Sequence, residues 1–216
     1  MDVYVEKGSK RVFAGAIDWP GYARAGRDER VALENLAAYG PRYARVVARS
    51  RLGFRTPRDA DDLVVVRRVA GASGTDFGVP EVPAPGDSEP IDDSELKRLI
   101  SLLRASWRAL DAAAGSARGR ELATGPRGGG RSLPAILDHV RDAEGGYLAR
   151  LAWKAPSGAD TQVVRAAVVH ALESAVRHGV EERGPRGGKR WVPRYFVRRV
   201  AWHALDHAWE IEDRSA

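Results

Sequence analysis

The chain has 216 residues, of which 44% are hydrophobic and none is cysteine, and its formal net charge is +6 at pH 7. This length suits one large domain or two small ones, and the absence of cysteine excludes disulfides, zinc–thiolate sites and a cysteine nucleophile, which leaves His, Asp and Glu as protein ligands for any metal. No apolar run is long enough to span a bilayer, and residues 1–11 lack the layout of a secretory signal, so we expect a cytoplasmic protein without a membrane partner.

The N-terminal third of the chain is predicted to be a small α+β domain that begins with a β-hairpin. In VYVEKGSKRVFAGAID, the strand-forming residues 3–6 and 12–18 are separated by a Gly-Ser-Lys turn, which favours antiparallel pairing. A further β-type run covers residues 63–69. Between these runs, Asp28 is placed to cap a helix, and Gly40-Pro41 should end or kink that helix.

The hairpin leads into DWPGYARAGRDERVALEN, which combines a D-x-P-G turn with a helix start of the form G-x-D-x-x-x-A-x-x-N. The residues of this pattern are Asp18, Pro20, Gly21, Gly26, Asp28, Ala32 and Asn35. The pattern resembles that of the HicB-like small α+β domains. The resemblance implies a domain that binds a small toxin protein, often beside a separate DNA-binding segment, although no ribbon or helix-turn-helix is visible here. An ancillary domain that packs on the rest of the chain is the alternative.

The densest basic run of the chain follows this helix and includes two aromatic residues, Tyr43 and Phe54. Arginines interleaved with aromatic residues can track a phosphate backbone and stack on bases, so nucleic acid is one partner to consider. Solvated surface arginines are the favoured alternative, because Arg is interleaved with Asp and Glu along the chain. The arginines of the run are Arg42, Arg45, Arg49, Arg51, Arg55 and Arg58.

Glycine and proline dominate GASGTDFGVPEVPAPGDSEPI, residues 71–91, in which no helix or strand periodicity can be drawn. This composition predicts a linker, with the domain boundary near residue 85. The predicted organisation is therefore a HicB-like domain at residues 1–70, this linker, and a helical domain at residues 92–214.

Four apolar-periodic segments follow the linker and predict four helices. They cover residues 92–115, 132–151, 161–178 and 193–213. Asp92 stands in capping-box spacing with Glu95, and Ser132 is placed to cap the second helix. Four helices with short links predict an antiparallel bundle, so the fold class of the whole chain is α+β.

WHALDHAWEIEDR, in the last predicted helix, places His203 and His207 four residues apart and therefore on one helix face. Two imidazoles at this spacing can reach one ion, but such a pair alone is weak support for a metal site, and a third ligand decides its value. His139 in the second helix lies near the expected inward face and is the candidate. The alternative is that these histidines hydrogen-bond in a dry core. We assign structural roles to His170 and His178.

ILDHVRDAEGGYLARL and VRRVAWHALDHAWEIEDR carry one histidine and an H-x-x-x-H pair. They resemble the ligand helices of the DinB-like (YfiT-type) four-helix bundles, and the resemblance covers residues 92–213. In that superfamily three histidines commonly bind a divalent metal, frequently zinc or nickel, and some members are thiol-dependent transferases or isomerases. The resemblance implies His139, His203 and His207 as ligands.

The function implied by the DinB-like resemblance is a metal-dependent enzyme, transferase-like or hydrolase-like, that acts on a small anionic or thiol substrate. The competing hypothesis is a non-catalytic binding protein in which the HicB-like domain engages a protein or nucleic acid. The sequence leaves open whether the chain forms a homodimer.

Carboxylates near the histidines are candidates for orienting the imidazole rings through hydrogen bonds. Spacing alone does not decide which of them point inward. The candidates are Asp138, Asp142, Glu144, Asp206 and Glu210.

The pentapeptide GPRGG occurs at residues 125–129 and again at 184–188, each time before a helix with a proposed ligand. Its glycines, the neighbouring cations and the adjacent helix N-terminus could together receive a carboxylate or phosphate. Ordinary loops with solvated arginines are the alternative. The candidate anion-binding residues are Arg127, Arg131, Arg186, Lys189 and Arg190.

Overall fold

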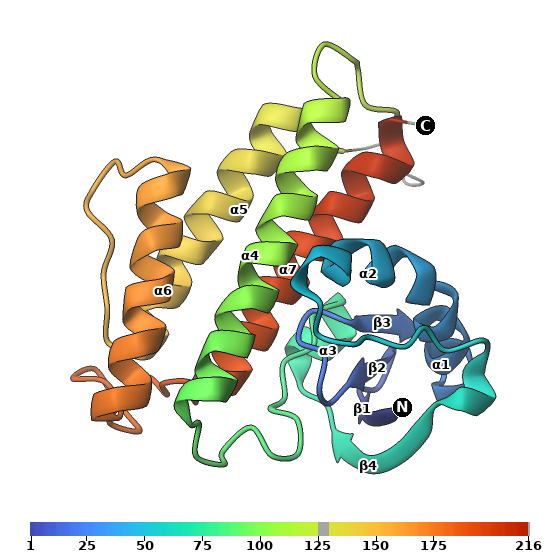
Figure 1. Ribbon diagram of the computed structural model, residues 1–216, viewed down its shortest axis with the longest axis horizontal. Coiled ribbons are helices and arrows are strands. Elements are labelled where there is room, and N and C mark those ends of the chain that lie inside the picture. Colours follow the sequence, from blue (N-terminus) through green and yellow to red (C-terminus); the bar gives the residue numbers. More distant parts are fainter. Residues whose placement is uncertain (125–129, 216) are drawn as a thin grey trace. The chain divides into compact units, whose positions relative to one another are not determined.

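The computed structural model describes residues 1–124 and 130–215 and divides the chain into two compact units, residues 1–89 and 90–216. The first unit combines a sheet with short helices, and the second is built from long helices (Figure 1), so the prediction of an α+β protein is confirmed. Within the described ranges, no helix is both long and apolar enough to cross a membrane.

The first unit is organised around a four-stranded mixed sheet with the strand order β3-β2-β1-β4. β1 and β2 form the predicted antiparallel hairpin, with Val3 opposite Ala16 and Lys7 opposite Val12. β4 pairs with β1 in parallel, and β3 pairs with β2 antiparallel on the other side. The strands are β1 (Asp2–Lys7), β2 (Val12–Ala16), β3 (Ala23–Gly26) and β4 (Val64–Ala70).

The one helix predicted in the first unit begins and ends where the local sequence indicates. Asp28 accepts a hydrogen bond of 2.8 Å from the N–H of Val31 and so caps α1 (Glu29–Ala38). Gly40-Pro41 ends that helix and starts α2 (Gly40–Val47). Two short 3-10 turns, η1 (Ala48–Ser50) and η2 (Ala60–Asp62), lead on to β4.

The two aromatic residues of the basic run belong to an aromatic cluster of the first unit, in which Tyr43 is buried and Phe54 is half-buried. Tyr43 is 1% exposed and stacks on Tyr22, with ring centroids 4.7 Å apart. Phe54 packs edge-on against Tyr43, at 5.0 Å between centroids. Because the ring of Tyr43 is buried, it cannot stack on a base, and only the half-buried Phe54 and the arginines of this run remain for contact with a polyanion.

The segment predicted as a linker is instead tied to the sheet of the first unit. It contains α3 (Ser73–Phe77). Glu6 of β1 is fully buried, and its carboxylate accepts hydrogen bonds from the Thr75 hydroxyl and from the N–H groups of Glu81 (2.9 Å) and Val82 (3.1 Å). Composition could not reveal these bonds, because the partners lie far apart in the sequence, and the unit boundary falls after Glu89.

We expect Glu6→Ala to release this segment from the sheet. The change removes a buried charged acceptor from three donors, and hydrogen bonds to charged groups contribute about 1.5–3 kcal/mol each, so we expect the protein to lose about 3 kcal/mol of unfolding free energy. Hydrogen exchange of residues 73–82 and urea unfolding measure the effect. Glu34→Ala, which removes an exposed ion pair with Arg30, is the control and should cost less than about 1 kcal/mol. Unchanged exchange in Glu6→Ala would contradict the anchoring role.

The second unit contains four long helices around one hydrophobic core, within the described ranges. Side chains from all four are fully buried in it, including Leu103, Ile136, Leu172 and Val200. Asp92 caps the first helix through the N–H of Glu95 at 2.8 Å, as predicted, whereas Ser132 stands at the start of the second helix without a side-chain hydrogen bond. The helices are α4 (Asp93–Ser116), α5 (Leu133–Leu148), α6 (Thr161–His178) and α7 (Pro193–Ser215).

These helices do not alternate in direction, which corrects the predicted antiparallel order. The N–H of Ala123, shortly after α4, donates to the carbonyl of Arg214 at the end of α7. Arg194, in the first turn of α7, donates to the carbonyl of Pro90 just before α4. α4 and α7 are therefore parallel neighbours, and α5 and α6 also share one direction (Figure 1).

The connection between α5 and α6 explains the parallel pairs. Residues 149–160 comprise a 3-10 turn, η3 (Ala149–Leu151), and a stretch without regular structure that ends at Asp160, the cap of α6. Extended chain advances about 3.3 Å per residue, whereas the 16 residues of α5 rise about 24 Å, so this connection is long enough to return to the opposite end of the helices. The expectation of short links between all four helices is therefore wrong at this connection.

Candidate metal centre

Three histidines converge inside the second unit. His139 comes from α5, and His203 and His207 come from α7. One ring nitrogen of each lies within 4.8 Å of the corresponding nitrogens of the other two. Nε2 of His139 is 3.2 Å from Nε2 of His203, and the three ring centroids are 4.7–5.1 Å apart. The three side chains proposed as ligands are therefore brought to one place.

Helix geometry explains the convergence. His203 and His207 are separated by one turn of α7, so both side chains leave the same face, and they are 7% and 8% exposed. On α5, Ile136 and Val140 are buried, and His139 between them is half-buried at the edge of that inward face. The approach of α5 to α7 thus supplies the third imidazole.

Burial keeps two of these rings neutral. Desolvation, together with the neighbouring cluster residues and Arg199, lowers the pKa of His203 to about 2. Desolvation also lowers the pKa of His139, and the positive charge of Arg131 adds to that shift. A neutral imidazole offers the lone pair that a metal ion requires, so both rings are in the ligating form at physiological pH.

The donor set fits a divalent ion of intermediate softness such as zinc or nickel. Two Zn–N bonds of about 2.0–2.1 Å at a tetrahedral angle hold the nitrogens about 3.3–3.4 Å apart, close to the 3.2 Å between His139 and His203. The same distance also allows a hydrogen bond between the two rings in one pair of tautomers. The other ring nitrogen of His203, Nδ1, is buried and makes no hydrogen bond within the described residues.

A chain of hydrogen bonds orients His207. Its Nδ1 lies 2.7 Å from Oε2 of Glu210, and the other oxygen of that carboxylate accepts from Arg214 at 2.7 Å. Arg214 in turn donates through Nε to the carbonyl of Ala123 at 2.8 Å. With Nδ1–H donating to the carboxylate, Nε2 of His207 carries the lone pair for an ion, which is the usual arrangement for ligating histidines.

The other candidate carboxylates are placed differently. Asp138 and Asp142 are exposed and form ion pairs with Arg141 at 2.7 and 2.8 Å. Glu144 is buried and accepts a hydrogen bond from Nε1 of Trp107 on α4. Asp206 lies half-buried on α7. The contact of Glu210 with His207 follows from their spacing, because residues three apart on a helix are neighbours.

The candidate anion-binding residues do not lie together at one site. Arg131 is exposed, and its charge acts on both His139 and His203, so it lies near the cluster. The first GPRGG segment, with Arg127, lies outside the described residues.

The second GPRGG segment lies at the other end of α5. The N–H of Trp191 donates to the carbonyl of Arg150, beyond the C-terminal end of α5, whereas His139 is near the start of that helix. Pro193 precedes His203 by ten residues of α7, or about 15 Å. The segment with Arg186, Lys189 and Arg190 therefore leads into α7 beside the end of α5 that is opposite His139.

Aromatic residues and one buried arginine lie beside the cluster, and none of them was predicted as a site residue. The Tyr147 ring lies 5.9 Å from the His203 ring. The guanidinium of Arg199 lies 5.3–5.8 Å from the ring centroids of Tyr147, Trp191 and Trp202. Arg199 stands one turn before His203 on α7, and that i, i+4 spacing is the signal that could have identified it.

In comparisons with known proteins, no protein-family model, no curated protein and no solved structure matches this chain.

Proposed function

We propose that the second unit is a DinB-like bundle that holds one divalent metal ion on His139, His203 and His207, with zinc or nickel as the expected ion. The observation that carries the proposal is the approach of one ring nitrogen from each histidine to within 4.8 Å of the others. The low pKa of the buried His203 and the hydrogen bond from His207 to Glu210 support it, because both favour neutral, oriented ligands.

We further propose that the protein is a metal-dependent enzyme, of transferase or hydrolase type, for a small anionic or thiol substrate. A divalent ion with three histidine ligands acidifies a bound water or accepts a thiolate at its remaining position. Arg131 near the cluster supplies positive charge that favours an anionic substrate. Glu210 keeps His207 in one orientation while substrate binds.

Metal analysis of the untagged protein tests the metal site. We expect about one equivalent of zinc or nickel in the wild-type protein, since a single three-histidine cluster is present among the described residues. His139→Ala should lose the ion, and because this ring is half-buried the variant should still fold. His170→Ala is the matched control, because His170 is an exposed histidine of α6 outside the cluster. Metal-free wild-type protein after exposure to both ions would favour the dry-core reading and a non-catalytic binding protein.

Cobalt substitution tests the proposed chemistry without an assay for turnover. Co²⁺ bound by three imidazoles absorbs in the visible range, and a small thiol such as 2-mercaptoethanol should add a sulfur-to-cobalt charge-transfer band if a position remains open. Acetate should perturb the visible bands without that new absorption. A cobalt spectrum unaffected by either probe would indicate a closed, structural ion and would overturn the enzymatic proposal.

Glu210→Gln is expected to weaken metal binding by about 10–100-fold, because the amide no longer attracts the Nδ1–H of His207 and frees the ring to turn. Isothermal titration with Zn²⁺ measures the change. Glu212→Gln, an exposed position on the same helix, should leave the affinity unchanged. Equal affinity of Glu210→Gln and the wild type would show that this carboxylate does not orient the ligand.

A further inference from the structure

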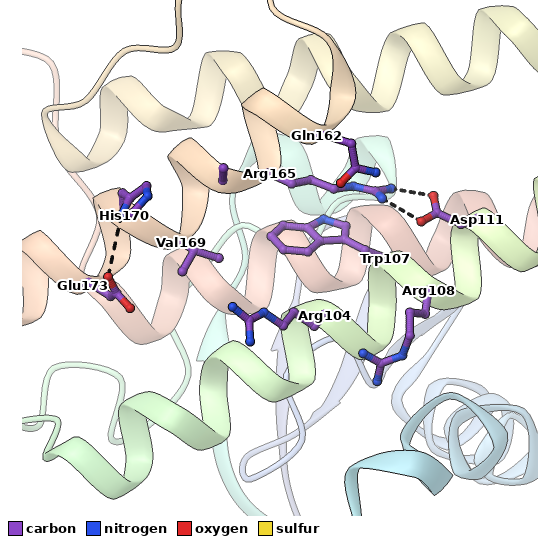
Figure 2. A pocket seen from close by; sticks show the side chains of 10 residues that line it. Arg104, Trp107, Arg108, Asp111, Gln162, Arg165, Val169, His170 and Glu173 are labelled. Carbon is purple, nitrogen blue, oxygen red and sulfur yellow. Dashed lines mark hydrogen bonds and ion pairs between the residues drawn. The ribbon is translucent and has the colours of Figure 1, made fainter.

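A groove between α4 and α6, separate from the histidine cluster, has the size of a small-molecule site (Figure 2). Its volume is about 480 Å³, within the range of ligand pockets. None of the three clustered histidines lines it. Its floor and its rim differ in chemistry, and together they define the kind of ligand that fits.

The floor of the groove is apolar. Trp107 of α4 is 5% exposed, and its Nε1–H donates to the buried carboxyl of Glu144 on α5 at 2.7 Å. The N–H of the indole therefore has its hydrogen-bond acceptor inside the bundle, and the part of the indole that lines the groove is made of ring carbons. Figure 2 shows the indole between the side chain of Val169 and the pair formed by Arg165 and Asp111.

One ion pair already spans the groove. The guanidinium of Arg165 on α6 binds both carboxylate oxygens of Asp111 on α4, at 2.8 and 2.9 Å. Arg165 is 7% exposed, lies 5.5 Å from the Trp107 ring centroid, and keeps a buried Nε with no hydrogen-bond partner among the described residues. The negative charge of Asp111 is therefore already paired with Arg165 inside the groove.

Two further arginines on the rim carry positive charge that no acidic group among the described residues pairs with. Arg104 and Arg108 line the groove one turn apart on α4, and both are exposed. Neither makes an ion pair or hydrogen bond with a described residue. On the α6 side, Glu173 faces His170 at 3.8 Å. The α4 rim therefore presents two arginines, one helix turn apart, whose side chains extend in different directions beside the apolar floor (Figure 2).

We propose that this groove binds a small aromatic carboxylate, with the carboxylate held by Arg104 and Arg108 and the ring against Trp107 and Val169. Guanidinium groups match carboxylates in geometry, and an indole face favours a planar ring. An aliphatic cation would meet like charge at the rim, and a small hydrophilic anion would leave the floor uncovered. This assignment does not depend on the metal.

Binding of 2-naphthoate to the full chain tests the proposal. In protein labelled with ¹⁵N at tryptophan, the indole N–H signal of Trp107 is identified as the one that Trp107→Phe lacks. We expect addition of 2-naphthoate to shift this signal, with a dissociation constant in the millimolar range. Arg104→Gln and Arg108→Gln should each weaken binding about tenfold, because each removes one charge-assisted contact. Arg177→Gln, an exposed arginine of α6 that does not line the groove, is the matched control and should bind like the wild type.

Three results would overturn the site. The first is that the Trp107 signal does not shift at about 10 mM naphthoate, and the second is that Arg104→Gln and Arg108→Gln both bind naphthoate as tightly as the wild type. The third is that Arg177→Gln loses as much affinity for naphthoate as those two variants do. Naphthalene-2-methanol, which lacks the charge, should bind more weakly than naphthoate, and equal binding would refute the role of the arginines. His139→Ala should bind naphthoate normally, so failure of the metal proposal and failure of this one are distinguishable.

Discussion

Zn²⁺ at a thousandfold excess over its dissociation constant is expected to raise the free energy of unfolding by about 4 kcal/mol, and His203→Ala is expected to abolish that increase. The reason is that His139 lies far from His203 and His207 in the sequence. The unfolded chain therefore cannot assemble the three imidazoles, and the ion binds the folded state alone. Urea unfolding followed by circular dichroism, with and without Zn²⁺, measures the difference.

The controls for this prediction separate ligand loss from loss of packing. His203 is buried, so His203→Ala can be destabilised without metal, and the comparison is therefore made within each variant, with and without the ion. His139→Ala, at a half-buried position, should lose the same increment, whereas His170→Ala should keep it. A full increment in His139→Ala would contradict coordination by all three histidines.

The second large effect concerns the buried Glu144. Glu144 is 1% exposed, and desolvation raises its pKa to about 7, against the opposing hydrogen bond from Trp107 and the charge of Arg165. A carboxyl with a raised pKa binds a proton more tightly in the folded state than in the unfolded chain. Its contribution to stability is therefore fully present below the unfolded pKa of 4.5 and is lost as the pH rises through about 7.

Glu144→Gln removes this dependence while keeping an oxygen that accepts from Trp107. We expect the variant and the wild type to unfold at similar urea concentrations at low pH, and the variant to be more stable by about 3 kcal/mol once the pH is above the folded pKa. Urea titrations at about pH 4 and about pH 8 measure how the difference in stability between the variant and the wild type grows with pH. Glu173→Gln, at a partly exposed glutamate of α6, should not alter the pH dependence. A constant difference between Glu144→Gln and wild type at both pH values would contradict the assignment.

Local signals in the sequence predicted most element boundaries. The caps at Asp28 and Asp92, the break at Gly40-Pro41 and the antiparallel hairpin all depend on residues that are near one another in the sequence, and the structure has each of them. The i, i+4 spacing of His203 and His207 on one face of a helix is also local. Such features could be predicted because short-range geometry decides them.

Features that join distant segments were predicted less well. The chain from Ser73 to Val82 has the composition of a linker, yet the buried carboxylate of Glu6 holds it on the sheet. The parallel course of α4 and α7 depends on the crossover at residues 149–160, which the pattern of apolar residues does not encode. Glu144 lies among the proposed carboxylates in sequence but contacts α4.

The sequence by itself determined the α+β class, the helix faces and the two histidines that one helix turn aligns, because periodicity and capping act over a few residues. Tertiary structure alone decided that His139 reaches those two, that Glu210 rather than Glu144 contacts the cluster, and that Arg104 and Arg108 border an indole floor. The physical reason is that helix packing, and not spacing along the chain, determines which buried groups share one environment.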